Sequence, residues 1–200
     1  MSFLPALRKV LAADHIVEPT LALTEKRAGS RCADIPVQYR GAHFAVRLRD
    51  NDHLKLLRGA SDRERGSVDG YTNLPDYLVF SEAPASKKDP RPVLRVLVCE
   101  LKSSDASRAL ARRQVQLGAL IVPYLVALAR LDAGLPPSTV HLCGVIAYQD
   151  LRPPQGRTRP GHIGEPEDDA PDPKVGIYVY PVPCGEPIYL DNFDYCPASS

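Results

Sequence analysis

Two stretches of the chain decide its fold: LPDYLVF at 74–80 and VLRVLVCELKSS at 93–104. Each contains an apolar run of strand length, and the polar segment between them is typical of a connection. Alternate side chains of a strand face opposite sides of the sheet, so Glu100 and Lys102 share a face with Val98. Because the longer run is apolar on both faces, we expect a strand covered on both sides. Glu100 and Lys102 should then emerge at its C-terminal end, where the cover stops.

The remainder of the chain indicates an α/β fold with a mixed central β-sheet flanked by helices, in a single domain over residues 1–200. The expected elements are a helix over about 3–13, a helical turn near 21–27, a strand or hairpin over 37–48, a helix over 105–131 that Pro123 kinks or divides, a strand over 140–148, and a hairpin formed by 174–182 and 187–190. Residues 49–70 and a proline-rich stretch at about 150–174 lack apolar periodicity and are expected to be loops.

Asp76 follows Pro75 at the start of the shorter apolar run. If the two strands are antiparallel neighbours, Asp76 lies beside the end that carries Glu100. Two close carboxylates repel each other, whereas a divalent cation between them makes the arrangement favourable. Oxygen ligands of this kind, completed by the Leu101 carbonyl, water and a substrate phosphate, suit Mg²⁺ or Mn²⁺ better than zinc. Lys102 would orient or help to deprotonate the attacking water, or neutralise charge that develops on the phosphate.

The pattern of Pro75 and Asp76 followed by Glu100, Leu101 and Lys102 resembles the signature of the PD-(D/E)XK, or restriction-endonuclease-like, nuclease superfamily. The resemblance covers about residues 70–130. It implies a restriction-endonuclease-like core and Mg²⁺-dependent hydrolysis of phosphodiester bonds, in DNA more often than in RNA, by an endonuclease or an exonuclease.

Gln114 is the polar exception in an apolar stripe of the long predicted helix. The stripe consists of Leu110, Gln114, Leu117, Ile121, Tyr124 and Leu128. Burial of an amide without partners costs roughly 1–3 kcal/mol, so Gln114 is expected to have a partner at the sheet end, such as a metal-bound water or a catalytic carboxylate. The simpler alternative is a core hydrogen bond to a backbone carbonyl. Several branches of the superfamily carry a glutamine at this position, and Gly118, one turn later, would let the helix approach closely.

Three arginines at the start of the same helix, Arg108, Arg112 and Arg113, could contact nucleic-acid phosphates. The alternative is a solvated helix face. Many members of the superfamily also place a glutamate on an N-terminal helix, and here Glu18 and Glu25 compete for that role, with Glu25 favoured.

The composition of the chain bears on its cellular location more than on its activity. The five cysteines, Cys32, Cys99, Cys143, Cys184 and Cys196, form no CxxC pair and are expected to be reduced thiols in a cytoplasm. The formal net charge of +1 neither supports nor excludes nucleic acid, because a nuclease needs only a local basic strip. No secretory signal is evident, and no apolar run approaches the roughly eighteen residues that a membrane span needs.

The sequence therefore predicts a cytoplasmic nuclease acting on nucleic acid, with DNA favoured, Mg²⁺ or Mn²⁺ as cofactor and no membrane partner. A homodimer or a partner protein is compatible with this prediction, and a role in bacterial defence or mobile-element processing follows only by analogy. Two alternatives stay open: a non-catalytic nucleic-acid- or protein-binding module that keeps the nuclease-like fold, and an α/β adaptor whose polar sheet end is a partner surface.

Overall fold

The computed structural model describes residues 3–11, 13–17, 22–24, 32, 34–48, 74–83, 93–102, 108–135, 139–149 and 165–198. Its helices are α1 (Leu4–Val10) and α2 (Arg108–Ala133), with 3₁₀ helices at η1 (Ala13–His15) and η4 (Leu190–Asn192). Its strands are β1 (Ile16–Val17), β2 (Val37–Gln38), β3 (His43–Arg47), β4 (Tyr77–Ala83), β5 (Val93–Lys102), β6 (Thr139–Tyr148), β7 (Val179–Pro183), β8 (Ile188–Tyr189) and β9 (Cys196–Pro197).

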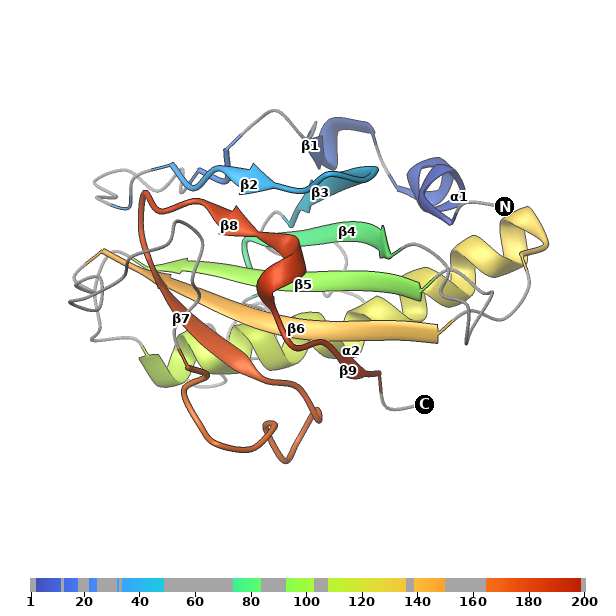
Figure 1. Ribbon diagram of the computed structural model, residues 1–200. Helices are drawn as coiled ribbons and strands as arrows, with labels where there is room; N and C mark the ends of the chain where they lie inside the picture. Colours follow the sequence, from blue (N-terminus) through green and yellow to red (C-terminus); the bar gives the residue numbers. More distant parts are fainter. Residues whose placement is uncertain are drawn as a thin grey trace, which may run out of the picture.

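The central sheet is mixed and has seven strands, in the order β1-β3-β4-β5-β6-β7, with β9 paired to β6. From β1 to β5 the neighbours are antiparallel, whereas β5, β6 and β7 run parallel. A parallel connection needs a crossover, and α2 supplies it between β5 and β6. The arrows of β5 and β6 both end at the left of Figure 1, where α2 begins. The predicted α/β class and mixed central sheet are confirmed.

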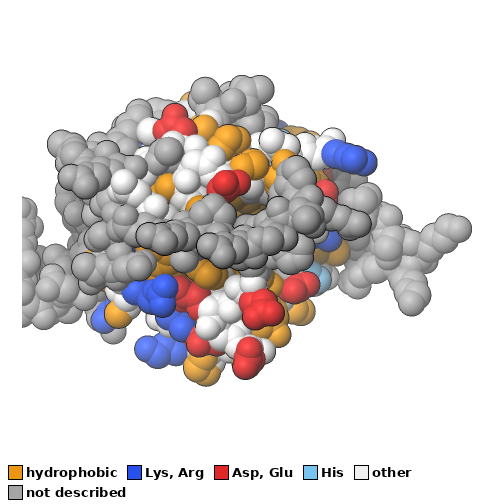
Figure 2. All heavy atoms as spheres, turned by 60° about the vertical axis from the view of Figure 1, so that its left-hand side comes forward, with side chains coloured by type: hydrophobic (Ala, Val, Ile, Leu, Met, Phe, Trp, Pro, Cys, Tyr) orange, Lys and Arg blue, Asp and Glu red, His pale blue; other side chains and the backbone are white. Residues whose placement is uncertain are grey.

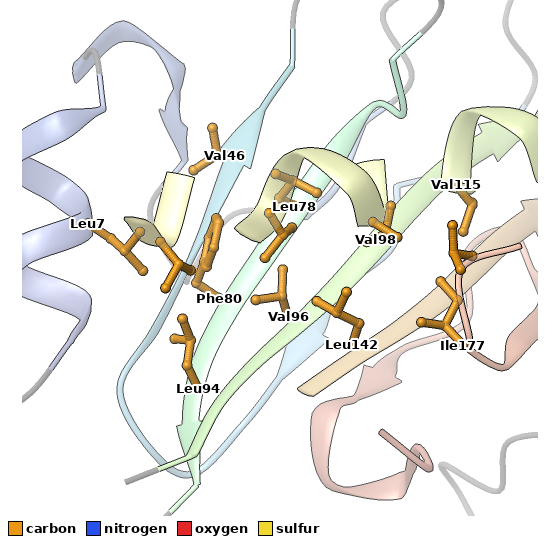
Figure 3. Packing of buried hydrophobic residues seen from close by; sticks show 14 of the residues in the cluster. Leu7, Val46, Leu78, Phe80, Leu94, Val96, Val98, Val115, Leu142 and Ile177 are labelled. Atoms are coloured by element: carbon orange, nitrogen blue, oxygen red, sulfur yellow. The ribbon is translucent and has the colours of Figure 1, made fainter. Parts of the chain in front are cut away.

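Both α-helices lie on the same face of this sheet. Figure 3 shows Leu7 of α1 and Val115 of α2 within one apolar core that also contains Val98 of β5. The opposite face carries a second core, in which Leu97 and Leu101 of β5 lie under the small parallel sheet of β2 and β8 and under η4. Among the described residues, the expected flanking by helices therefore holds for one face only.

The buried face of α2 is not the predicted stripe. Its buried residues are Ala111, Gln114, Val115, Gly118, Ala119, Val122, Val126 and Ala129. Of the predicted stripe only Gln114 is buried, and Tyr124 is 64% exposed. The physical reason is close packing: small side chains let the helix axis approach the sheet, which leaves the bulkier residues at the flanks.

α2 also differs from expectation in its continuity and its apolar length. It runs as one helix from Arg108 to Ala133 with Pro123 inside it, so the proline does not divide it. By length and composition alone α2 could cross a membrane, contrary to the expectation that no segment comes close. Its buried residues, however, pack on β5 and β6 as those of a core helix do.

Several short elements find partners distant in sequence rather than local ones. Leu23 forms an antiparallel bridge with Ile35, where a helical turn was expected. The two strands within 37–48 belong to different sheets, because β2 pairs with β8 and β3 pairs with β4. β7 pairs with β6, so the hairpin expected of 174–182 and 187–190 does not form either.

The proline-rich stretch at about 150–174 is described from Glu165 onward. The N–H of Glu167 donates to the carbonyl of Val179 at 2.8 Å, and the N–H of Asp172 donates to that of Ile177 at 2.7 Å. Asp172 is only 3% exposed. This part of the stretch has no helix or strand of its own, yet it is hydrogen-bonded to the residues at and before the start of β7.

The expectation of five reduced thiols is wrong, because Cys32 and Cys184 form a disulfide. The two residues are 152 apart in sequence, and their Cα atoms are 5.2 Å apart. The pairing of β2 with β8 brings their segments together. Cys99, Cys143 and Cys196 are free. Disulfides persist in oxidising compartments, so the cysteines no longer support a cytoplasmic location.

Candidate active site

The register of β4 and β5 places Asp76 opposite Glu100. Tyr77 pairs with Cys99, and the antiparallel register continues to the residue on either side. The N–H of Asp76 donates to Glu100 Oε2 at 3.1 Å, and the N–H of Leu101 donates to Asp76 Oδ2 at 2.9 Å. Each carboxylate is thus held by the backbone of the neighbouring strand, as the antiparallel arrangement predicts.

Lys102 and Gln114 complete a connected polar group at this end of the sheet. Lys102 forms an ion pair with Glu100 and donates from Nζ to Gln114 Oε1 at 2.8 Å. Gln114 Nε2 donates to the carbonyl of Leu74 at 3.0 Å. An ammonium group only donates and a carbonyl only accepts, so the opposite orientation of the Gln114 amide would satisfy neither contact. Gln114 therefore joins α2 both to Lys102 and to the segment that leads into Asp76.

Gly118 allows α2 to lie close to this segment. A Cβ atom at Gly118 would lie 2.5 Å from Val98 Cγ1 and 2.6 Å from Pro75 Cγ. Real Cβ contacts are not that short, so only glycine fits without a shift. Since Pro75 immediately precedes Asp76, the spacing between α2 and β4 bears directly on where Asp76 lies.

Pro75 itself has a consequence for the carbonyl of Leu101. In the continued register, Pro75 stands opposite Leu101, and proline has no N–H to donate. In an extended strand the N–H and C=O of one residue point to the same side, and the N–H of Leu101 points to Asp76. The Leu101 carbonyl therefore also faces the β4 side, where the ladder hydrogen bond from residue 75 cannot form.

The group is buried more deeply than the sequence suggests. Glu100 is 0% exposed, Lys102 4% and Gln114 2%. The expectation that Glu100 and Lys102 emerge from the cover of the sheet is wrong, because α2 reaches over the end of β5 through Gln114. Asp76 is half-buried, which makes it the most accessible of the four side chains.

The electrostatics of the group favour a cation. The group contains two carboxylates and one ammonium, so it carries net negative charge. On the other face of β5, burial raises the pKa of the Cys99 thiol well above its ordinary value, and the negative charges of Asp76 and Glu100 raise it further. A bound cation would relieve this excess of negative charge.

The ligands available at this end of the sheet fit Mg²⁺ or Mn²⁺. No group of three or more His, Cys, Asp or Glu side chains that could hold a metal occurs among the described residues, so that part of the chain offers no zinc cage. Mg²⁺ commonly takes one or two protein carboxylates and completes its shell with water and substrate phosphate. Asp76 and Glu100 can supply the carboxylates, and Leu101 its carbonyl.

Arg108 and Arg112, at the start of α2, contact acidic side chains. Arg108 lies 3.7 Å from Glu167 Oε1, and its guanidinium is 5.4 Å from the ring centroid of Tyr148. Arg112 forms ion pairs with Asp168 and Asp172. Arg113 is exposed. Carboxylates of the 165–172 segment thus occupy two of the three predicted phosphate contacts.

Two glutamates were predicted as candidates for this site, and two groups that lie at the site were not predicted. Glu18 and Glu25 lie outside the described residues. The Leu74 carbonyl was not predicted, because nothing in a sequence marks a backbone acceptor. Tyr148, which pairs with Lys102 in the parallel register of β5 and β6, was not predicted either. The position of Tyr148 at the end of an apolar run is visible in the sequence, but its neighbour is not.

Comparison of the chain with protein-family models, with curated proteins and with solved structures finds no match in any of the three. The side chains of the candidate site and their geometry are therefore what bear on its class.

Proposed function

We propose that this chain is a Mg²⁺- or Mn²⁺-dependent nuclease of the PD-(D/E)XK type that hydrolyses phosphodiester bonds in DNA. The observation that supports this proposal is the connected group of Asp76, Glu100, Lys102 and Gln114 at one end of the mixed sheet. A restriction-endonuclease-like core is part of the same proposal, with α2 as the crossover that covers the site. Bacterial defence or mobile-element processing would be a fitting setting by analogy alone.

We assign each residue of the group a role that is consistent with its contacts. Asp76 and Glu100 hold the cation, which when bound would polarise the phosphate and acidify a water. Lys102, held by Glu100 and Gln114, directs its ammonium group at the attacking water or at the phosphate. Gln114 is a positioning residue, because it fixes the direction of Lys102. The half-buried Asp76 marks the side from which a phosphate can enter.

Burial of the group is favourable for this chemistry. Charges in a low-dielectric environment interact more strongly than in water, so a positioned ammonium stabilises developing negative charge effectively. Lys102 is held from two sides, by Glu100 and by Gln114. Little reorganisation is then needed when the substrate arrives.

Cleavage assays test the proposal directly. Purified protein is incubated with Mg²⁺ or Mn²⁺ and closed circular plasmid, linear duplex, single-stranded DNA or RNA, and cutting of the closed circle distinguishes an endonuclease from an exonuclease. We expect DNA cleavage that Lys102→Ala reduces by about a hundredfold or more. Since Lys102 is buried, Asp76→Asn provides a second, half-buried variant, and Asp169→Asn is the exposed acidic control. Intact substrates with folded wild-type protein and either metal would contradict the proposal.

Titration calorimetry separates metal binding from cleavage. Asp76→Asn should abolish or strongly weaken the Mg²⁺ isotherm, because one of the two carboxylate ligands becomes a neutral amide. The control Asp169→Asn should leave the isotherm as in the wild type. An Asp76→Asn isotherm that matches the wild type would remove Asp76 from the ligand set.

A non-catalytic binding module is the second candidate function. The observation that favours it is the almost complete burial of the ion pair between Glu100 and Lys102, whose side chains are 1% and 5% exposed. A buried pair can be retained for structure alone, since removal of one partner costs about 3–5 kcal/mol. Binding of nucleic acid without cleavage in the assays above would favour this module over the nuclease.

A further inference from the structure

The second arginine of α2 is held in place from its inner side by Asp172. Arg112 Nε donates to Asp172 Oδ2 at 2.8 Å, and the same carboxylate accepts from Gln116 Nε2 at 2.8 Å and from the N–H of Lys174 at 2.9 Å. Burial alone would raise the pKa of Asp172, but these hydrogen bonds and the charge of Arg112 outweigh it and lower the pKa. Asp172 therefore stays ionised and holds Arg112 in one orientation.

The other side of the Arg112 guanidinium forms an ion pair with a different and more exposed carboxylate, that of Asp168. Arg112 Nη2 pairs with Asp168, whose side chain is 52% exposed, whereas that of Asp172 is 2% exposed. An exposed ion pair contributes little to stability, so one partner is readily replaced by another ion. Separating a buried pair is costly, because it leaves a buried charge without a partner. The Asp168 contact is thus the exchangeable one of the two.

The first arginine of α2 also contacts a carboxylate, but this one is nearly buried, because the Glu167 side chain is 9% exposed. Its guanidinium lies over the ring of Tyr148 at 5.4 Å and within 3.7 Å of Glu167 Oε1. The Arg108 side chain is 55% exposed, so it could also reach a ligand from solvent. Burial raises the pKa of Glu167, and the charges of Arg108 and Arg112 offset this rise only in part.

These contacts lie beside the candidate active site. Arg108 lies over the ring of Tyr148, and Tyr148 pairs with Lys102 across β5 and β6. Figure 2 shows basic and acidic side chains side by side on the lower part of the end that comes forward. A nucleic-acid strand in the site would carry phosphates across this surface. Carboxylate and phosphate bind guanidinium groups in the same way.

We propose that Asp168 occupies, on Arg112, a position that a phosphate of a bound nucleic acid takes. Asp168 is then an internal competitor, displaced from Arg112 when nucleic acid binds, while Asp172 and Glu167 remain in place. This inference depends on the proposed function only in taking nucleic acid as the partner.

The test measures binding without cleavage. Fluorescence anisotropy of a labelled short DNA duplex and of its single strand is followed in EDTA, for wild type, Asp168→Asn and Asp169→Asn. The two substitutions remove the same charge from neighbouring exposed residues, and only Asp168 pairs with Arg112. We expect Asp168→Asn to lower the Kd by about two- to fivefold more than Asp169→Asn does.

Further variants make the outcome decisive. In an Arg112→Gln background, Asp168→Asn and Asp169→Asn should give the same Kd, because the ion pair between Arg112 and Asp168 is already absent. Equal Kd values for the two asparagine variants would overturn the inference, as would the absence of DNA binding by every variant. Tighter binding by Asp168→Asn together with no cleavage in Mg²⁺ would uphold the inference and contradict the nuclease proposal.

Discussion

Replacement of Gln114 by leucine tests the link between α2 and the candidate site without reference to any activity. The variant loses a charge-assisted hydrogen bond from Lys102 and a neutral one to the Leu74 carbonyl, at 2.8 and 3.0 Å. Leucine is close to glutamine in volume, so little cavity is created. Bonds to charged groups contribute about 1.5–3 kcal/mol and neutral ones about 0.5–1.5 kcal/mol, so we expect a loss of roughly 2–4.5 kcal/mol.

Urea unfolding followed by circular dichroism measures this loss, with an unchanged slope as the sign that only stability changed. Gln116→Leu is the matched control on the same helix. It removes one hydrogen bond to the ionised Asp172, which keeps its contacts with Arg112 and Lys174, so the expected loss is about 1.5–3 kcal/mol. If Gln114→Leu costs no more than Gln116→Leu, the chain from Lys102 through Gln114 to Leu74 does not contribute as its geometry implies.

Three more perturbations have defined outcomes. Gly118→Ala should destabilise by about 1–3 kcal/mol, because the added methyl meets Val98 and Pro75, and a melting temperature equal to the wild type would show that the helix is not tightly packed there. Cys32→Ser should lower the free energy of unfolding by about 2–5 kcal/mol without reductant, and should differ little from the wild type when reductant is present. A wild type whose stability does not respond to reductant would argue against the disulfide. Asp172→Asn should weaken the dependence of the unfolding free energy on pH at acid pH. The lowered pKa of Asp172 stabilises the fold above the ordinary aspartate pKa, and this contribution disappears as the pH falls through the pKa of the folded state. Parallel curves of unfolding free energy against pH for the variant and the wild type would contradict this prediction.

Much of the candidate site could be predicted from the sequence because its geometry is local. Alternation along a strand puts Glu100 and Lys102 on one face, and an antiparallel neighbour suffices to bring Asp76 beside them. Gln114 could be singled out because an amide in an apolar stripe needs a partner. In the structure the anticipated backbone carbonyl is present, whereas the partner at the sheet end is the Lys102 ammonium and not a carboxylate.

The errors share one physical cause, which is competition from partners distant in sequence. The apolar residues of α2 permit more than one buried face, and the sheet selects the one with small side chains. The expected hairpins are replaced by pairings between β2 and β8 and between β6 and β7. Cys32 finds Cys184 only because those strands are neighbours.

The sequence by itself determined the α/β class, the two strands that carry the acidic residues and the side of the strand on which Glu100 and Lys102 lie. These features depend on periodicity and on a single neighbouring strand. Tertiary structure alone decided how deeply the charged groups are buried, which face of α2 covers them, and which carboxylates meet Arg108 and Arg112. Those outcomes depend on contacts across the whole sheet, whose free energies arise only when segments far apart in the chain are brought together.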